Sequence, residues 1–405
     1  MTSDSTSDDE RELSQGPKAG RHWTPELEEY VDPGTGARVR QLTTQPGAQD
    51  HHLYFTTGGW YDDGRRLLLR SVREGEWDLF SIDLETGQLT QLTDLPQDVS
   101  GSTRVNERTG EVYFAYSFEG EAYDNDVIVG LDLHTLAVRP VVEKPEGYDD
   151  YNFGVDDVLA DDERLLVSVG ERTDGEGHAG IHETYPQSAI FTAEIEGDDD
   201  LELVHGEEYW ISHVNASPTR PELLTYCHEG PWDYVDNRIH VANLETGETY
   251  RLRETDEETA VGHEYWLADG EYVGYHGWRG ERTPEDSFHG TVRYDDTDRL
   301  ETKIPVRRTH CHSNTRERFV CDGDDTKAQY LLLYERDEDG EYRQPRKLAS
   351  HAWGEDSPHP HSRFSPDGST VVFGADRAGP DNDVFLVDVP DDVTTLPLYH
   401  DPNAE

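Results

Sequence analysis

The chain has 405 residues and a formal net charge of -52, with 33% hydrophobic and 30% charged residues. This charge argues against nucleic acid or an anionic membrane as a partner, because both are polyanions that such a surface repels. The 8 Trp, 21 Tyr and many short apolar runs indicate a folded protein rather than a disordered chain. An excess of Asp and Glu over Lys is typical of proteins from a halophile's cytoplasm. Molar salt there shortens the Debye length to about 3 Å and screens the repulsion between the negative charges of the protein.

Neither a signal peptide nor a membrane span is predicted. Residues 1–15 are rich in Ser, Asp and Glu, and no stretch approaches 18 consecutive apolar residues. The cysteines Cys227, Cys311 and Cys321 are odd in number and form no CxxC, so no disulfide framework is implied and a reducing compartment is the simpler assumption. We therefore expect a cytoplasmic protein without a membrane partner, whose cysteines pack on inner strands as small apolar side chains.

The chain begins with an expected disordered acidic tail, residues 1–20, followed by one folded domain, residues 21–405. A short alternating strand is predicted at 36–43. A unit of four strands joined by hairpins follows, and turn residues separate its members. Its strands are expected at 53–55, 67–69, 78–83 and 88–92.

This unit recurs along the whole chain. A turn followed by a short apolar strand returns at intervals of roughly 46 to 58 residues, within the range of a propeller blade with long loops. The strands that follow these turns are expected at 112–116, 165–169, 223–226, 272–275, 319–321 and 370–373. No helical pattern of credible length lies between them, which disfavours βαβ units.

The predicted fold is therefore an all-β, seven-bladed β-propeller. The last unit has little chain left for a fourth strand after residue 389. The spare strand at 36–43 can supply it, which closes the ring with an N-terminal strand and removes exposed sheet edges.

Two histidines two residues apart, His359 and His361, are the strongest candidate ligands. In an extended segment these residues project to the same side, and Pro360 between them stiffens the pair. Further histidines stand at the same place relative to the next strand: His51, His52, His213, His263, His310 and His312. In a propeller these loops gather around the central channel, so we predict a bound metal, against the alternative of solvated loop histidines.

Four segments carry a resemblance to a known family. They are YCHEGPWD at 226–233, GHEYW at 262–266, HPH at 359–361 and HLYF at 52–55. Together they resemble the oligogalacturonate lyases, seven-bladed cytoplasmic propeller enzymes of pectin breakdown, over residues 31–390. The resemblance implies β-elimination of short oligogalacturonides, in particular unsaturated digalacturonate, to an unsaturated monosaccharide uronate, with Mn²⁺ or another divalent metal as cofactor.

The resemblance also implies roles for single residues. His263 matches the family's proposed base, and Arg238 matches an arginine that holds the substrate near that base, which suits a guanidinium facing a carboxylate. His228 lies in a segment that matches the family and is a candidate for substrate contact. The resemblance leaves its precise role open.

The implied metal ligands come from two further segments. His359 and His361 match two ligands, and a third comes from the segment 309–314, where His310 and His312 both remain open. The family places Gln three residues before the first His of the HPH pair, and this chain has Asp356 there. A carboxylate also ligates Mn²⁺, so Asp356 is included in the predicted site.

Two other functions fit a propeller. A non-catalytic TolB-like or WD40-like platform for protein interaction needs no histidines around its channel, which separates it from a metal enzyme. The propeller half of a serine peptidase is disfavoured because the sequence contains no GxSxG.

Overall fold

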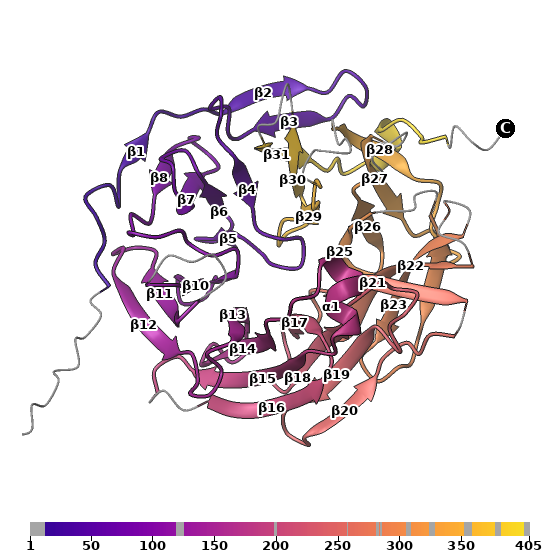
Figure 1. Cartoon of the computed structure of the whole chain (residues 1–405). Coiled ribbons are helices and arrows are strands. Elements are labelled where there is room, and N and C mark those ends of the chain that lie inside the picture. Colours follow the sequence, from indigo (N-terminus) through magenta and orange to yellow (C-terminus); the bar gives the residue numbers. More distant parts are fainter. Residues whose placement is uncertain are drawn as a thin grey trace, which may run out of the picture.

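Seven antiparallel sheets stand around a central axis in the described part of the chain (Figure 1). The computed structural model describes residues 13–118, 125–197, 201–256, 258–280, 283, 286–304, 309–323, 329–351, 359–376 and 382–400. The prediction of an all-β, seven-bladed propeller is confirmed.

The blades follow one another in chain order, each running from an inner strand to the rim. The first contains β4 (Asp50–His52), β5 (Trp60–Tyr61), β6 (Arg66–Ser71), β7 (Asp78–Asp83), β8 (Leu89–Gln91) and β1 (His22–Trp23). The second contains β9 (Thr103–Asn106), β10 (Glu111–Tyr116), β11 (Val127–Asp132) and β12 (Val138–Glu143). The third contains β13 (Tyr151–Val158), β14 (Arg164–Glu171), β15 (Gln187–Glu194) and β16 (Leu201–Glu208). The fourth contains β17 (Ile211–Ala216), β18 (Leu223–His228), β19 (Ile239–Asn243) and β20 (Glu248–Arg251).

The remaining three blades bring the chain back to its start. The fifth contains β21 (Thr259–Trp266), β22 (Tyr272–Arg279), β23 (Ser287–Arg293) and β24 (Leu300–Lys303). The sixth contains β25 (Cys311–Thr315), β26 (Arg318–Cys321), β27 (Tyr330–Glu335) and β28 (Arg346–Ser350). The seventh contains β29 (Arg363–Phe364), β30 (Thr370–Asp376), β31 (Asn382–Asp388), β3 (Arg38–Gln41) and β2 (Glu28–Val31).

The ring is closed by the N-terminal strand, as the sequence predicts. In β3, Val39 pairs with Val387 and Gln41 with Phe385, so indigo and yellow strands share one sheet in Figure 1. Before β3 the chain adds β2 to the seventh blade and β1 to the first. The first and last blades are thereby joined by main-chain hydrogen bonds, which leaves the ring without a seam.

Apolar side chains from neighbouring blades make the core. The middle strands are apolar on both faces because each blade packs between two others; the residues of β7 and β18, for example, are all buried. The rim strands are polar and exposed, as in β20. Leu42, Phe80 and Leu386 belong to one such cluster, which lies between the first and seventh blades.

The chain leaves its strand at residues 53–55, where the sequence predicts strand structure. Tyr54 and the residues beside it lie between β4 and β5, and the amide of Thr57 donates to the carbonyl of Tyr54 in a turn. This detour brings Phe55 into a small buried cluster with Tyr265 and Leu267. A tertiary contact, rather than strand propensity, decides the local conformation here.

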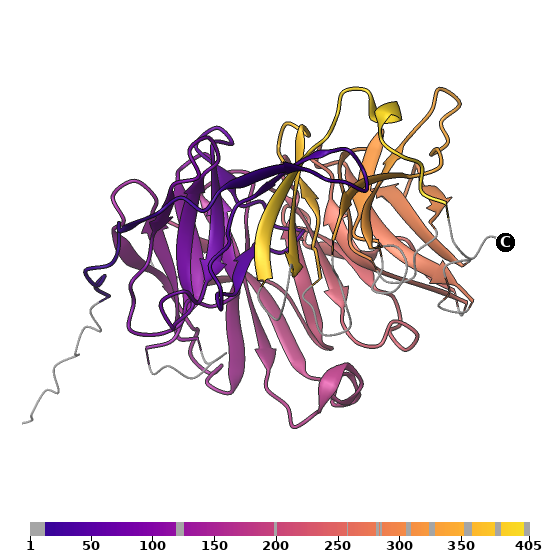
Figure 2. The same cartoon turned by 90° about the horizontal axis from the view of Figure 1, so that it is seen from above.

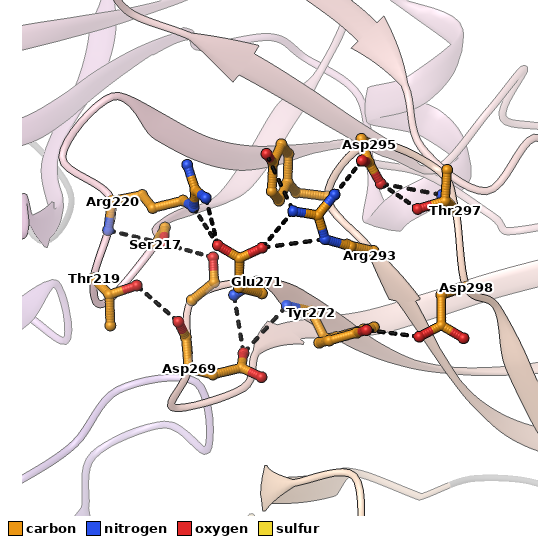
Figure 3. A network of polar contacts seen from close by, with 12 residues as sticks. Ser217, Thr219, Arg220, Asp269, Glu271, Tyr272, Arg293, Asp295, Thr297 and Asp298 are labelled. Carbon is orange, nitrogen blue, oxygen red and sulfur yellow. Dashed lines mark hydrogen bonds and ion pairs between the residues drawn. The ribbon is translucent and has the colours of Figure 1, made fainter.

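Carboxylate–arginine contacts join blades near the rim. Figure 3 shows Glu271 of the fifth blade accepting hydrogen bonds from Arg220 of the fourth blade at 2.6 Å and from Arg293 at 2.7 Å. Thr219 and Ser217 of the fourth blade also donate to the carbonyls of Asp269 and Gly270. Such links hold neighbouring blades in register.

Two short helical segments lie on opposite faces of the ring. Helix α1 (Gly177–Glu183) projects from one face, and the 3-10 helix η1 (Val393–Thr395) lies towards the other (Figure 2). No helix in the described residues is long and apolar enough to cross a membrane. The first twelve residues of the expected acidic tail lie outside the described residues, whereas Gln15 already donates to the carbonyl of Leu92 in the first blade.

The expectation that disulfides are lacking is wrong for one pair. Cys311 of β25 and Cys321 of β26 are directly opposite in the ladder and form a disulfide. Their separation of ten residues across a hairpin brings the two sulfurs together, which an odd number of cysteines does not reveal. Cys227 is free and buried, as expected.

Candidate metal centre

Three imidazoles meet at one mouth of the channel. Nitrogen atoms of His310, His359 and His361 all lie within 4.8 Å of one another. The ring centroid of His310 is 4.5 Å from that of His361 and 5.2 Å from that of His359. Three imidazole nitrogens at this spacing suit one face of a divalent-metal site.

Local backbone geometry positions these rings. His310 precedes the inner strand β25, and His361 precedes β29 with a positive φ of 51°. His52, from the first blade, hydrogen-bonds through Nε2 to the carbonyl of Pro360 at 3.0 Å, which supports the HPH segment from the neighbouring blade. The left-handed conformation at His361 costs energy in isolation and is held by these contacts.

Asp322 orients the cluster from behind. Its Oδ2 accepts from Nδ1 of His310 at 2.9 Å, and its two oxygens accept the amides of His361 at 3.1 Å and Ser362 at 2.8 Å. A carboxylate only accepts, so Nδ1 of His310 carries the hydrogen and Nε2 keeps its lone pair for a metal. Burial lowers the pKa of His310 and of His361 well below the usual value, so both rings are neutral, as ligation requires.

The structure separates His310 from His312, between which the sequence left the choice open. Nδ1 of His312 accepts the amide of Phe364 at 3.3 Å, and its ring stacks on Tyr265 at 5.3 Å, on the inner side of β25. His310 precedes β25 and lies with the HPH pair, whereas His312 lies further along this strand and outside the cluster. The predicted ligand Asp356 lies outside the described residues.

His263 lies beside the three-histidine cluster. Its ring centroid is 4.2 Å from that of His310, and its Nδ1 is 2.7 Å from the carbonyl oxygen of Thr309. A β-bulge between Gly262 and Tyr265, with φ of 53° at His263, turns the side chain into the channel. Because the Thr309 carbonyl accepts from Nδ1, Nε2 is the unprotonated nitrogen.

Burial is the main reason why His263 is neutral. It lowers the pKa of this ring well below the usual value, and the neighbouring His310 and Arg238 lower it further. A neutral imidazole with a free Nε2 can accept a proton.

Arg238 is buried between two carboxylates. Its guanidinium donates to both oxygens of Glu229, at 2.6 and 3.2 Å, and its Nε donates to Glu264 at 3.4 Å. Glu229 in turn lies 3.3 Å from Nε2 of His213, which has a positive φ of 46° in the bulge of β17. A substrate carboxylate that reaches Arg238 must therefore share it with Glu229.

His228 does not join the cluster. Its Nδ1 is 2.6 Å from Asp236, its Nε2 is 2.8 Å from Glu207, and its ring stacks on Tyr209 at a centroid distance of 3.8 Å. Its backbone amide donates to the carbonyl of Arg238 at 3.0 Å. Both ring nitrogens are thus occupied by carboxylates between the third and fourth blades.

Sequence reasoning missed Asp322, Glu229 and Tyr54 as parts of this site. Tyr54 lies in the HLYF segment, and its ring contacts those of His361 at 4.8 Å and His213 at 5.7 Å. Asp322 follows the strand that pairs with β25, so its neighbourhood to His310 depends on ladder register, which the sequence does not give. Glu229 could have been noticed because it follows His228 directly in the resembling segment.

Comparison with known families and proteins agrees with this architecture. A family model described as oligogalacturonate lyase matches residues 18–329. An oligogalacturonide lyase of Pectobacterium atrosepticum is 24% identical over 398 residues, covering 90% of this chain and 96% of the relative. An oligogalacturonate lyase of Dickeya dadantii is 24% identical over 253 residues, covering 61% of this chain and 62% of the relative.

Two solved structures share the fold over nearly their whole length. One, an oligogalacturonate lyase in complex with manganese, superposes with a TM-score of 0.79 at 21% identity and covers 93% of this chain and 99% of its own. The other, an oligogalacturonate lyase from Vibrio parahaemolyticus, has a TM-score of 0.78 at 21% identity and covers 92% and 99%.

Proposed function

Because the chain belongs to the oligogalacturonate lyase family, we propose that it cleaves short oligogalacturonides by metal-assisted β-elimination, with His263 as the base. The substrate class follows from the family, and unsaturated digalacturonate is the substrate we propose within it. The proposed product is an unsaturated monosaccharide uronate. The observation that supports this function best is the adjacency of a neutral imidazole with a free Nε2 to three imidazoles that converge on one point.

The proposed reaction removes the proton at C5 of a uronate and breaks the C4–O bond. The C5 proton is α to a carboxylate and only weakly acidic, so the negative charge that develops needs stabilisation. A divalent cation held by His310, His359 and His361 would supply this by neutralising the uronate carboxylate. We propose Mn²⁺, since the first of the two structural relatives described above is a complex with manganese.

His263 supplies the proton acceptor in this proposal. The Thr309 carbonyl fixes the ring orientation and the tautomer, and Thr309 is covalently next to His310. One dipeptide therefore positions both the base and a ligand. A substrate whose carboxylate lies at the cluster would place its neighbouring C5 proton on the side of His263.

Arg238 is proposed to assist at the same site, through a shared carboxylate network. Glu229 and Glu264 fix its guanidinium, and it also lies over the ring of Trp232, 5.7 Å from the centroid. A uronate carboxylate entering from the channel would replace part of the contact with Glu229, which is 2.6 Å from Arg238 Nη1. We propose that His228 supports Arg238 through the backbone instead of contacting substrate, because its ring nitrogens are already occupied.

We propose a cytoplasmic, halophilic protein that binds neither nucleic acid nor membrane. Its net charge of -52 supports this, because a surface of this kind repels polyanions and is tolerated best in molar salt. The Cys311–Cys321 disulfide is the observation that stands against a reducing compartment. Cell fractionation with detection in the soluble cytoplasmic and the exported fractions tests the location.

The role of His263 is tested by the His263→Ala variant. General bases typically accelerate a reaction about 10²–10⁴-fold. We therefore expect kcat to fall by about 10²-fold or more, while the metal content of the protein stays unchanged. His289→Ala, which removes another buried histidine of the fifth blade, is the matched control and should keep activity if it folds. A His263→Ala enzyme with kcat near that of the wild type would exclude His263 as the base.

A further inference from the structure

Two neighbouring inner strands carry a histidine at the same place in the same kind of bulge. The pairing of β17 with β18 and that of β21 with β22 each skip two residues, and the first of these is His213 in β17 and His263 in β21. Both have a left-handed backbone, with φ of 46° and 53°, and such bulges re-aim the side chain that they carry. The ring of His213 stacks on Tyr54 at a centroid distance of 5.7 Å, and Tyr54 contacts His361 of the cluster at 4.8 Å. His213 therefore lies at the same mouth of the channel as the proposed base.

The proposed elimination needs a proton donor as well as a base. When the C4–O bond breaks, its electron pair stays on the glycosidic oxygen, and a donor that protonates this oxygen typically accelerates such a reaction about 10²–10⁴-fold. The neutral His263 serves as the base, and the guanidinium of Arg238 does not release its proton. Neither of these residues can act as the donor.

His213 has the geometry of a donor. Its Nε2 lies 3.3 Å from Oε2 of Glu229, whereas its Nδ1 makes no hydrogen bond with the described residues. The side chain is 31% exposed, so a substrate at the mouth can reach it. When the ring is protonated, it gives the Nε2 hydrogen to Glu229 and keeps the Nδ1 hydrogen for the substrate.

Glu229 is the charged group closest to His213. Burial opposes the ionisation of Glu229, but Arg238 and His213 outweigh it and hold the pKa of this carboxyl well below its usual range. The other titratable groups that interact with the ring of His213 come from other blades: Tyr54, Asp156, His263 and His310. Among the described residues only Glu229 lies within hydrogen-bond distance of the imidazole, so this carboxylate sets the orientation of the ring.

We propose that His213 is the catalytic acid of the elimination and gives its Nδ1 proton to the glycosidic oxygen while His263 takes the proton from C5. The C5–H and C4–O bonds break, a double bond forms between C4 and C5, and the electron pair of the C4–O bond takes the proton of His213. His263 ends as the imidazolium and His213 as the neutral imidazole, and exchange with water restores both. Glu229 is a positioning residue in this step. The inference rests on the proposed function, since it assigns a second proton transfer to the same reaction.

The test compares two leaving groups with the His213→Asn variant. Asn tolerates a left-handed backbone and cannot act as an acid, so the change removes only the donor. On trigalacturonate we expect kcat to fall about 10²–10⁴-fold. On the methyl glycoside of 4-deoxy-4-fluoro-D-galacturonate, kcat should stay near that of the wild type, because fluoride leaves without a proton. Ultraviolet absorbance of the new double bond and fluoride release measure the two rates, and calorimetric titration with Mn²⁺ should show unchanged metal affinity.

Two further variants serve as controls. His263→Ala should lose activity on both substrates, since both require removal of the C5 proton. His205→Asn should keep both activities, because it removes another imidazole beside a glutamate, with Nε2 3.1 Å from Glu207, but on the rim strand β16.

A second substitution keeps the test decisive if His213→Asn does not fold. Glycine also suits the φ of 46° at this position, so His213→Gly should show the same contrast between the two substrates, and added imidazole should restore cleavage of trigalacturonate. Cleavage of trigalacturonate near the wild-type rate, or an equal loss on both substrates, would overturn the role of His213 and leave the lyase function in place. A wild-type protein that is inert towards both substrates would overturn the proposed function and this role together.

Discussion

Asp322 positions two of the proposed metal ligands from outside the cluster. It accepts from Nδ1 of His310 and from the amides of His361 and Ser362, so one carboxylate fixes the tautomer of one ligand and the backbone of the other. Residues that orient a metal-binding imidazole in this way commonly affect affinity by about 10–100-fold. The same logic applies to the Thr309 carbonyl, which fixes the tautomer of His263.

The Asp322→Asn variant tests this role. We expect its metal affinity to fall about 10–100-fold, because an amide can donate to Nδ1 and so disturb the tautomer that leaves Nε2 free. Asp383→Asn is the matched control, since Asp383 is also buried and accepts from Gln41 at 2.9 Å and Thr43 at 3.2 Å far from the cluster. Calorimetric titration with Mn²⁺ measures both, and equal affinity in the two variants would contradict the role of Asp322.

At the scale of the elements, His228 lies between the carboxylates of Asp236 and Glu207, which come from two neighbouring blades. Burial opposes protonation of His228, yet the hydrogen bonds with Asp236 and Glu207 outweigh it and raise the pKa of the ring. Burial also opposes ionisation of Asp236, but the pairing with His228 lowers its pKa to about 2. The pairing joins β18 to β16 of the neighbouring blade.

The pH dependence of stability follows from these directions. Because the folded pKa of His228 is raised, its contribution is fully present below the unfolded value of about 6.5 and is lost as pH rises through the folded pKa. The depressed pKa of Asp236 contributes above about pH 4 and is lost as pH falls towards 2. We expect His228→Gln to lose about 1.5–3 kcal/mol near pH 6 and less above pH 8. Urea denaturation at both pH values measures this, and an equal loss at both would be against it.

Elements were predictable from the sequence to different extents. Alternation and turn residues gave the number of blades and the closing strand at 36–43, because these features are local and repeat. The choice of His310 over His312 could not be made, since two residues at i and i+2 project to the same side and only their depth along the channel separates them. The pairing of Cys311 with Cys321 and the contact of Asp322 with His310 both depend on hairpin register, which a one-residue shift would change completely.

At the scale of the whole molecule, charge is the dominant property. The 87 Asp and Glu face only 35 Lys and Arg, and arginines are placed between carboxylates of adjacent blades, as around Glu271 in Figure 3. These pairs are about one-third exposed, so each adds little by itself. The acidic residues also outnumber Lys and Arg by 52, so most of them cannot have a cation of their own.

Stability should therefore depend strongly on salt. Screening of repulsion among 52 net negative charges favours the compact state, so we expect the melting temperature to rise from 0.1 to about 2 M KCl. Differential scanning calorimetry over this range measures it. A flat or falling melting temperature would contradict the interpretation of the surface as an adaptation to salt.

The central claim is a metal-dependent elimination at the three-histidine cluster, and absorbance of the new double bond measures it most directly. Chelated enzyme with saturated trigalacturonate should show no rise in ultraviolet absorbance, and added Mn²⁺ should restore it, because only elimination creates a double bond conjugated to the carboxylate. His310→Ala should not be restored by Mn²⁺, whereas His312→Ala, which removes the neighbouring histidine that contacts the Phe364 amide outside the cluster, should respond as the wild type does. Release of reducing sugar without absorbance, or full activity in the presence of chelator, would contradict the proposed chemistry.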